Sequence, residues 1–222
     1  MEVVKYAIKG SDYVGVFATA TDKFVFLGQG LTQHNKEFLS SKLGVRSIEM
    51  SVSGSDLIGL FARANSNGIV LSNLFVDDDM ASLKRMDLGI NIEVLDSTLN
   101  AIGSNVLVND KIAIVNSDYD TKAVQQIRDA FGVEVVKARI NGFRTMGANN
   151  ILTNKGFVIS NKSTDEEKEH LDKVSGFNST RTTANTGSLY IGLSVIVNSN
   201  AVVAGEGTTG YELSRIVDGL EQ

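Results

Sequence analysis

Short apolar runs and amphipathic stretches alternate along the whole chain in a fixed order. An apolar segment such as 60–64 is followed by a turn rich in Asn and Gly at 65–68 and by a second apolar run at 69–71. Asn and Gly tolerate the positive φ that tight connections need, so each such pair of runs predicts a β-hairpin. Equivalent first segments recur at 16–20, 104–108, 148–152 and 193–197.

An amphipathic helix is predicted after each hairpin. Val124, Ile127 and Phe131 recur at spacings of three and four and share one face, while the opposite face is charged. The same spacing joins Leu213, Ile216 and Leu220 near the end of the chain. These helices are followed by a third apolar segment, which predicts one further strand at 45–50, 90–95, 133–138 and, with a more polar sequence, 177–182.

Helix-start signals support this interpretation. Thr209 with Glu212, and Ser163 with Glu166, have the spacing of a capping box, in which side chains and backbone amides at the helix start bond reciprocally. The acidic run 77–79 suits the positive end of a helix dipole. Each unit is therefore predicted to be strand, strand, helix, strand.

Two glycine series show that this unit is repeated five times. The first, spaced 44, 44, 44 and 45 residues, is called here the ring glycines: Gly15, Gly59, Gly103, Gly147 and Gly192. The second keeps the same period and falls where the helices are expected to stop, which is the position that favours a left-handed residue: Gly44, Gly89, Gly132, Gly176 and Gly219.

The fifth unit is too short, because only three residues follow Gly219. The N-terminal sequence MEVVKYA resembles the strand VEVVKA at 133–138, so we expect it to supply the missing strand and to close a ring. A linear array would need polar caps at its ends instead. The sequence thus predicts one α/β domain of five units: 11–52, 53–97, 98–140, 141–184, and 185–222 completed by 1–10.

Composition limits the possible functions. A formal net charge of −5 argues against a broad nucleic-acid-binding face, since phosphate binding needs clustered Lys and Arg. The chain has no cysteine, no apolar run near the roughly 20 residues that span a bilayer, and no apolar signal-peptide stretch at its start. We therefore expect a cytoplasmic protein without disulfides.

Three features could carry chemistry, and each has a simpler structural interpretation. The loop GEGTTG at 205–210 suggests phosphate binding, but it lacks the Walker lysine and Thr209 is better explained as a helix cap. His34 and His170 lie in expected exposed helical segments, and the acidic runs lack the spacing of a calcium loop. No cofactor, metal site or catalytic constellation is predicted.

Several stretches resemble a known family over essentially the whole chain. They are SGSDLIG at 53–59, GANNILTNKG at 147–156, ANTG at 184–187, IVNS at 196–199 and GTTGYEL at 207–213. With the fivefold plan, they resemble the translation initiation factor six family, ribosome anti-association factors of the pentein fold. The chain ends at Gln222, so the likeness is to the compact archaeal form without the C-terminal tail of eukaryotic members.

The resemblance implies a stoichiometric binder rather than an enzyme. Pentein enzymes that modify guanidines use a cysteine nucleophile, which this chain lacks. The family binds the large ribosomal subunit near the sarcin-ricin loop, contacts a ribosomal protein at the subunit interface, and blocks the small subunit. A monomer is implied, with no membrane or DNA partner.

The family's docking loops lie beside the ring glycines. Carried over residue by residue, the ribosome-binding role falls on Tyr13, Gly15, Leu60, Gly103, Ser104, Gly147 and Ala148. Ser104 and Asn105 stand where the family has asparagine and an apolar residue, which puts that part of the face in doubt. The alternatives are a non-catalytic ring that binds another protein or itself, and an enzyme that uses carboxylates in the central channel.

Overall fold

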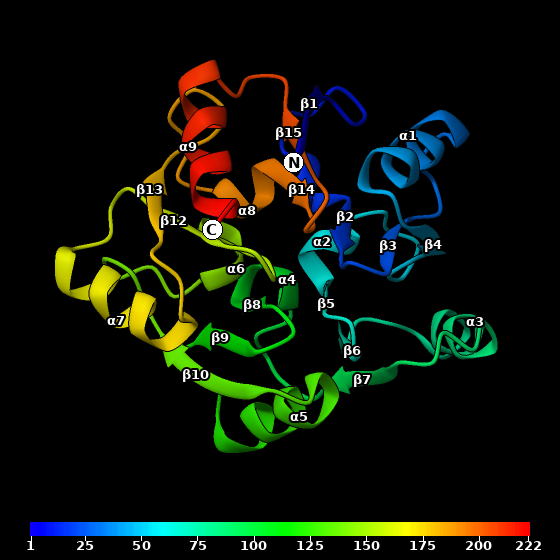
Figure 1. Cartoon of the computed structure of the whole chain (residues 1–222). Helices are drawn as coiled ribbons and strands as arrows, with labels where there is room; N and C mark the ends of the chain where they lie inside the picture. The colour runs from blue at the N-terminus through cyan, green and yellow to red at the C-terminus, as the bar shows by residue number, and fades with distance from the viewer.

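The structure, a computed structural model that describes residues 1–222, is a ring of similar units around a central axis (Figure 1). Inner-strand residues from all five units line a central channel along this axis. Five three-stranded sheets surround the axis, and five long helices lie at the rim. The rim helices are α1 (Gln33–Leu43), α3 (Asp77–Arg85), α5 (Thr121–Phe131), α7 (Asp165–Ser175) and α9 (Gly210–Leu220). No helix has both the length and the apolar character needed to cross a membrane.

Each sheet has an inner, a middle and an outer strand. The inner strands are β2 (Ala18–Ala20), β5 (Ala62–Ala64), β8 (Val106–Val108), β11 (Ile151–Leu152) and β14 (Val195–Val197). The middle strands are β3 (Phe24–Gly28), β6 (Gly68–Ser72), β9 (Ile112–Asn116), β12 (Phe157–Ser160) and β15 (Ala201–Gly205). The outer strands are β4 (Arg46–Met50), β7 (Asn91–Leu95), β10 (Glu134–Ala138), β13 (Thr180–Thr182) and β1 (Glu2–Tyr6).

Strand pairing follows one rule in every unit. The inner strand is antiparallel to the middle strand, as a hairpin requires, and the outer strand is parallel to it after the crossover through the rim helix. In the last sheet the outer strand comes from the other end of the chain: β1 pairs in parallel with β15, from Glu2 opposite Ala201 to Tyr6 opposite Gly205. The predicted α/β ring closed by the N-terminal strand is confirmed.

The apolar core also joins neighbouring units. Ile127 and Phe131 of α5 pack in one cluster with Val115 of their own sheet and with Val70 and Leu95 of the preceding sheet. The first unit does the same across the closure, because Leu39 and Leu43 of α1 share a cluster with Val203 of β15, in the fifth sheet. Burial between units therefore stabilises the ring as a whole, including the point where the chain ends meet.

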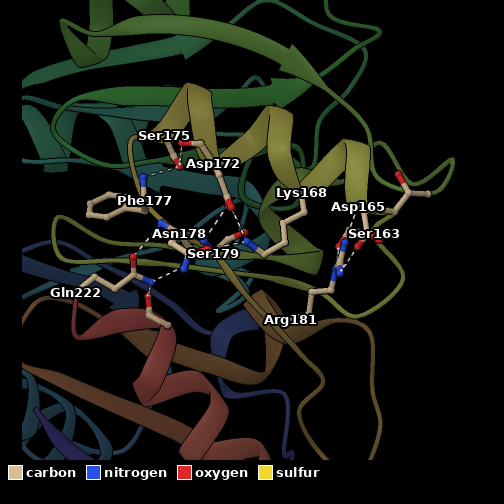
Figure 2. Close-up of polar contacts among 12 residues, drawn as sticks. Ser163, Asp165, Lys168, Asp172, Ser175, Phe177, Asn178, Ser179, Arg181 and Gln222 are labelled. Atoms are coloured by element: carbon tan, nitrogen blue, oxygen red, sulfur yellow. Dashed lines mark hydrogen bonds and ion pairs between the residues drawn. The ribbon is translucent and has the colours of Figure 1, made fainter.

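Polar contacts tie the C-terminus to the fourth unit (Figure 2). Gln222 Nε2 donates to the Asn178 carbonyl at 2.7 Å, and the Asn178 amide donates to Gln222 Oε1 at 2.9 Å. In the same region the Arg181 guanidinium contacts Asp165 at 2.8 Å, across the start of α7. Hydrogen bonds and an ion pair thus link the segment around β13 to the C-terminus and to α7.

Three expectations from the sequence concern the starts of the helices. Thr209 and Glu212 form the predicted capping box, but the second box is Thr164 with Glu167, one residue after the predicted Ser163 with Glu166. Ser163 is buried instead, and its hydroxyl bonds the Ser160 carbonyl. As predicted, the acidic run opens helix α3 at Asp77.

The second glycine series serves as helix ends in three units only. Gly44, Gly132 and Gly176 are left-handed caps after α1, α5 and α7. Gly89 has a positive φ but lies beyond the end of α3, and Gly219 lies inside α9. A Cβ on Gly219 would lie 2.7 Å from Val158 Cγ2, so close packing on the fourth sheet explains this glycine rather than a helix end.

The predicted five-residue inner strands are shorter than expected. The chain first makes one short helical turn at each ring glycine and only then enters the strand. These turns are η1 (Val14–Val16), α2 (Ile58–Phe61), α4 (Ile102–Asn105), α6 (Met146–Asn149) and α8 (Ile191–Ser194). Apolar runs this short do not distinguish a buried turn from a strand by periodicity.

Candidate functional site

The five short turns surround one end of the channel, which we call the glycine end. Here the backbones of successive units touch: a Cβ on Gly59 would lie 1.8 Å from the Gly15 carbonyl oxygen, and one on Gly103 would lie 1.9 Å from the Gly59 oxygen. The series continues through Gly147 and Gly192, at 2.2 and 2.0 Å, back to Gly15. The ring glycines are required because no side chain fits between these turns.

The structure separates the seven candidate contact residues into two groups. Tyr13 is exposed and Leu60 is half-buried, so both present side-chain atoms at the glycine end. The other five are buried and shape the backbone beneath: Gly15, Gly103, Ser104, Gly147 and Ala148.

A second exposed tyrosine, which the sequence reasoning missed, extends this surface. Tyr190 is 46% exposed and precedes Gly192 by two residues, the position that Tyr13 holds before Gly15. Tyr13 and the Tyr190 loop are in contact, since the Tyr13 hydroxyl lies 3.2 Å from Ser188 Oγ. Tyr190 could have been predicted from the sequence, because it occupies the same position in the repeat as Tyr13. We call the surface that Tyr13 and Tyr190 form the aromatic patch.

A buried carboxylate fixes the loop that leads to Tyr190. Glu212 accepts hydrogen bonds from the Gly187 amide at 2.8 Å, the Thr209 amide at 2.8 Å and the Thr183 hydroxyl at 2.7 Å. Burial by itself would raise the pKa of Glu212, but these hydrogen bonds to the charged form outweigh it and hold the pKa below its usual value. The capping glutamate therefore also positions part of the glycine end.

Two cations near this end are already paired. Lys9 Nζ lies 2.5 Å from Asp56, and Arg144 lies 2.5 Å from Asp118. Burial would raise the pKa of Asp56, but hydrogen bonds from Lys9 and from the Gly30 amide lower it overall. Paired charges of this kind do not form the concentrated positive field that phosphate backbones select.

The other end of the inner strands, the hairpin end, has a different chemistry. Five equivalent turn residues lie around the axis: Asp22, Ser66, Asp110, Asn154 and Ser199. Asn154 Nδ2 donates to Asp110 at 2.7 Å and to Asp22 at 2.8 Å, so one amide bridges both carboxylates. The hydroxyls of Ser66 and Ser199 complete the network by donating to Asp110 at 2.7 Å and to Asp22 at 2.8 Å.

The remaining candidate chemistry is not brought together. His34 on α1 and His170 on α7 are both exposed, and they lie in different units. No group of three or more His, Cys, Asp or Glu side chains is arranged to hold a metal ion. In the loop at 205–210, Thr209 caps α9.

The chain is similar to known proteins over nearly its whole length. The model of the eIF-6 family matches residues 3–219. Curated proteins named translation initiation factor 6 are similar along nearly their whole length: that of Pyrococcus horikoshii is 36% identical, with 99% of each chain covered, and that of Picrophilus torridus is 33% identical, with 98% of this chain and 99% of the relative covered.

Solved structures with the same fold are enzymes at low sequence identity. A dimethylarginine dimethylaminohydrolase with S-methyl-L-thiocitrulline has a TM-score of 0.52 at 9% identity, covering 98% of this chain and 95% of its own. The enzyme from Pseudomonas aeruginosa with citrulline has a TM-score of 0.51 at 10% identity, with 98% and 96% covered. These likenesses establish the pentein fold, whereas the full-length family match identifies the relatives. The chain therefore belongs to the eIF-6 family of translation initiation factors.

Proposed function

We propose that this protein binds the large ribosomal subunit at the subunit interface and sterically prevents its association with the small subunit. It acts in translation initiation and large-subunit biogenesis in the cytoplasm, as a monomer. The observation that carries this proposal is the aromatic patch on a backbone ring in which successive turns touch. Membership of the eIF-6 family is consistent with a partner on the ribosome.

The chemistry of the glycine end favours a ribosomal protein over bare RNA as the main contact. Tyrosines are enriched where protein interfaces are most strongly stabilised, because they bury a large ring and keep a hydrogen-bonding tip. Tyr13 and Tyr190 offer this combination, while Lys9 and Arg144 are neutralised by neighbouring carboxylates. We therefore propose that the patch contacts a ribosomal protein near the sarcin-ricin loop.

The buried members of the candidate set act indirectly in this proposal. Gly103, Ser104, Gly147 and Ala148 hold the turns α4 and α6 in place, and Gly15 does so for η1. Their substitution would disturb the face through the backbone rather than by removing a contact.

Occlusion needs no chemical step. The sequence contains no cysteine that could act as the nucleophile of the enzyme branch of the fold. A bound body of 23.8 kDa on the interface prevents subunit joining by volume alone.

A sucrose-gradient experiment tests the proposal. The purified protein is mixed with large and small subunits from a matched archaeal source at magnesium concentrations where they join. We expect co-migration with the large subunit alone and fewer joined ribosomes. Tyr13→Glu, which adds a charge to the aromatic patch, should weaken binding by about tenfold or more.

Lys111→Glu is the control, because it places the same side chain at an exposed position in the hairpin turn between β8 and β9. It changes the net charge by two units rather than one, so it also covers any non-specific effect of added negative charge. It should bind like the unmodified protein. Equal weakening by both substitutions would contradict docking through the glycine end. Absence of co-migration by the unmodified protein would favour a ring that binds another protein.

A further inference from the structure

The middle of the central channel is lined by different side chains in the five units, although the repeat places them at equivalent positions. Five equivalent positions, four residues after each ring glycine, meet there: Thr19, Arg63, Leu107, Ile151 and Ile196. They line a cavity of about 40 Å³, and most of its lining residues are hydrophobic. Three of the five side chains are aliphatic, so the fold accepts an apolar residue at this level and the arginine is an exception.

Arg63 lacks a charged partner in this channel. One terminal guanidinium nitrogen donates to the carbonyl of Gly103 and lies 3.5 Å from that of Gly147, at the glycine end. No carboxylate forms an ion pair with Arg63. Burial lowers the pKa of Arg63 to about 10, so the side chain keeps its charge at neutral pH.

Two hydrogen-bond donors in the same wall have no partner within the protein. Arg63 Nε is buried and makes no hydrogen bond, and the same holds for Thr19 Oγ1, on a residue only 2% exposed. The two residues lie on neighbouring inner strands, β5 and β2, and both line the cavity. Buried donors without partners are costly, and because Arg63 as a whole is half-buried, this cost falls on its Nε and on Thr19 Oγ1.

We propose that the central channel binds one small monovalent anion, of the size of chloride, against Arg63. Such an ion compensates the guanidinium charge and accepts hydrogen bonds from the unpartnered donors of the wall. The cavity has room for it, since a space of about 10–15 Å³ already holds a water.

Halide-dependent stability tests this site. Melting temperatures are compared in sodium chloride, sodium bromide and sodium gluconate at equal ionic strength, because gluconate is too large for the cavity. Ligand that binds only the folded state raises the melting temperature as its concentration rises above the dissociation constant. We expect chloride and bromide to stabilise the unmodified protein over gluconate and to have no such effect on Arg63→Leu.

A second measurement does not depend on the folding of a variant. Crystals of the full chain grown in bromide should show one anomalous peak in the channel, within hydrogen-bonding distance of Arg63 Nε. Water alone at that position, or an equal halide response of the unmodified protein and Arg63→Leu, would overturn the proposal. Thr19→Val, which removes only the hydroxyl donor, should reduce the halide effect without abolishing it.

Discussion

The two ends of the channel are built from the same inner strands but are held together by different groups. At the glycine end the backbones of adjacent turns touch, so a Cβ on Gly103 would lie 1.9 Å from the Gly59 oxygen. At the hairpin end, side chains span the gaps, as Asn109 Nδ2 does when it donates to the Thr153 carbonyl of the next unit at 2.9 Å.

This difference explains which end is suited to binding. The polar side chains of the hairpin end are already bonded to one another, so contact with a partner would compete with those bonds. At the glycine end the joints between units use the backbone, which leaves Tyr13 and Tyr190 free to face a partner. Backbone contacts and hairpin-end side chains join the units of the ring, whereas the exposed tyrosines of the glycine end remain for contact with a partner.

The largest effect should come from adding one methyl group at the glycine end. Gly103→Ala forces two backbones apart, because the nearest atom to the new Cβ is a carbonyl oxygen that cannot move away alone. We expect a loss of more than about 4 kcal/mol in the free energy of unfolding, measured by urea denaturation.

Gly210→Ala is the control for this substitution. Gly210 is exposed at the first position of α9, and a Cβ there meets no atom within 4 Å. It should leave stability unchanged or raise it by about 0.5–1 kcal/mol. Similar stability of the two variants would contradict backbone contact at the ring glycines.

An intermediate effect is expected where a buried side chain supports the glycine end. Glu212→Gln replaces an acceptor by an amide that faces the donors of Thr183, Gly187 and Thr209, and should cost about 3 kcal/mol at neutral pH. Because the pKa of Glu212 is lowered in the folded state, its contribution is present above the pKa of the unfolded chain and is lost as pH falls through the folded value.

The stability difference between the unmodified protein and Glu212→Gln should therefore be constant near neutral pH and should shrink in the acidic range below the usual glutamate pKa. Urea denaturation over a pH series measures it. A difference that is the same at all pH values would mean that the glutamate acts through packing and not through its charge.

The smallest effect is expected at the hairpin end. Asp110→Ala removes the acceptor for Ser66 and Asn154, but Asp110 is only half-buried and water can replace part of what is lost. We expect a loss of about 1–2 kcal/mol by urea denaturation, and unchanged binding to the large subunit. Loss of ribosome binding in a folded Asp110→Ala protein would place the hairpin end in the interface.

The ring could be predicted from the sequence because the residues that form it recur at a fixed spacing. The ring glycines repeat wherever two turns touch, and the short fifth unit together with the strand-like N-terminus indicated closure. The binding face could be predicted only in part. The segment 104–108 gave no sign that Ser104 lies buried in a short helical turn. Tyr13, three positions earlier in the repeat of the first unit, is exposed.

Hydrogen bonds between side chains of different units could not be predicted from the sequence either. Asp110 and Asn154 carried only the signal of turn formation, because their bonds join residues 44 or 132 positions apart. Arg63 lies in a segment with the pattern of an ordinary inner strand, and its unpaired charge becomes evident only when the five strands surround the channel.

The most direct test of the central claim is a reconstruction of this protein bound to the large ribosomal subunit. We predict that the glycine end faces the subunit, with Tyr13 and Tyr190 against a ribosomal protein, and that the body overlaps the position of the small subunit. Contact through the ring of Asp22, Asp110 and Asn154 at the hairpin end, or binding away from the subunit interface, would contradict the account.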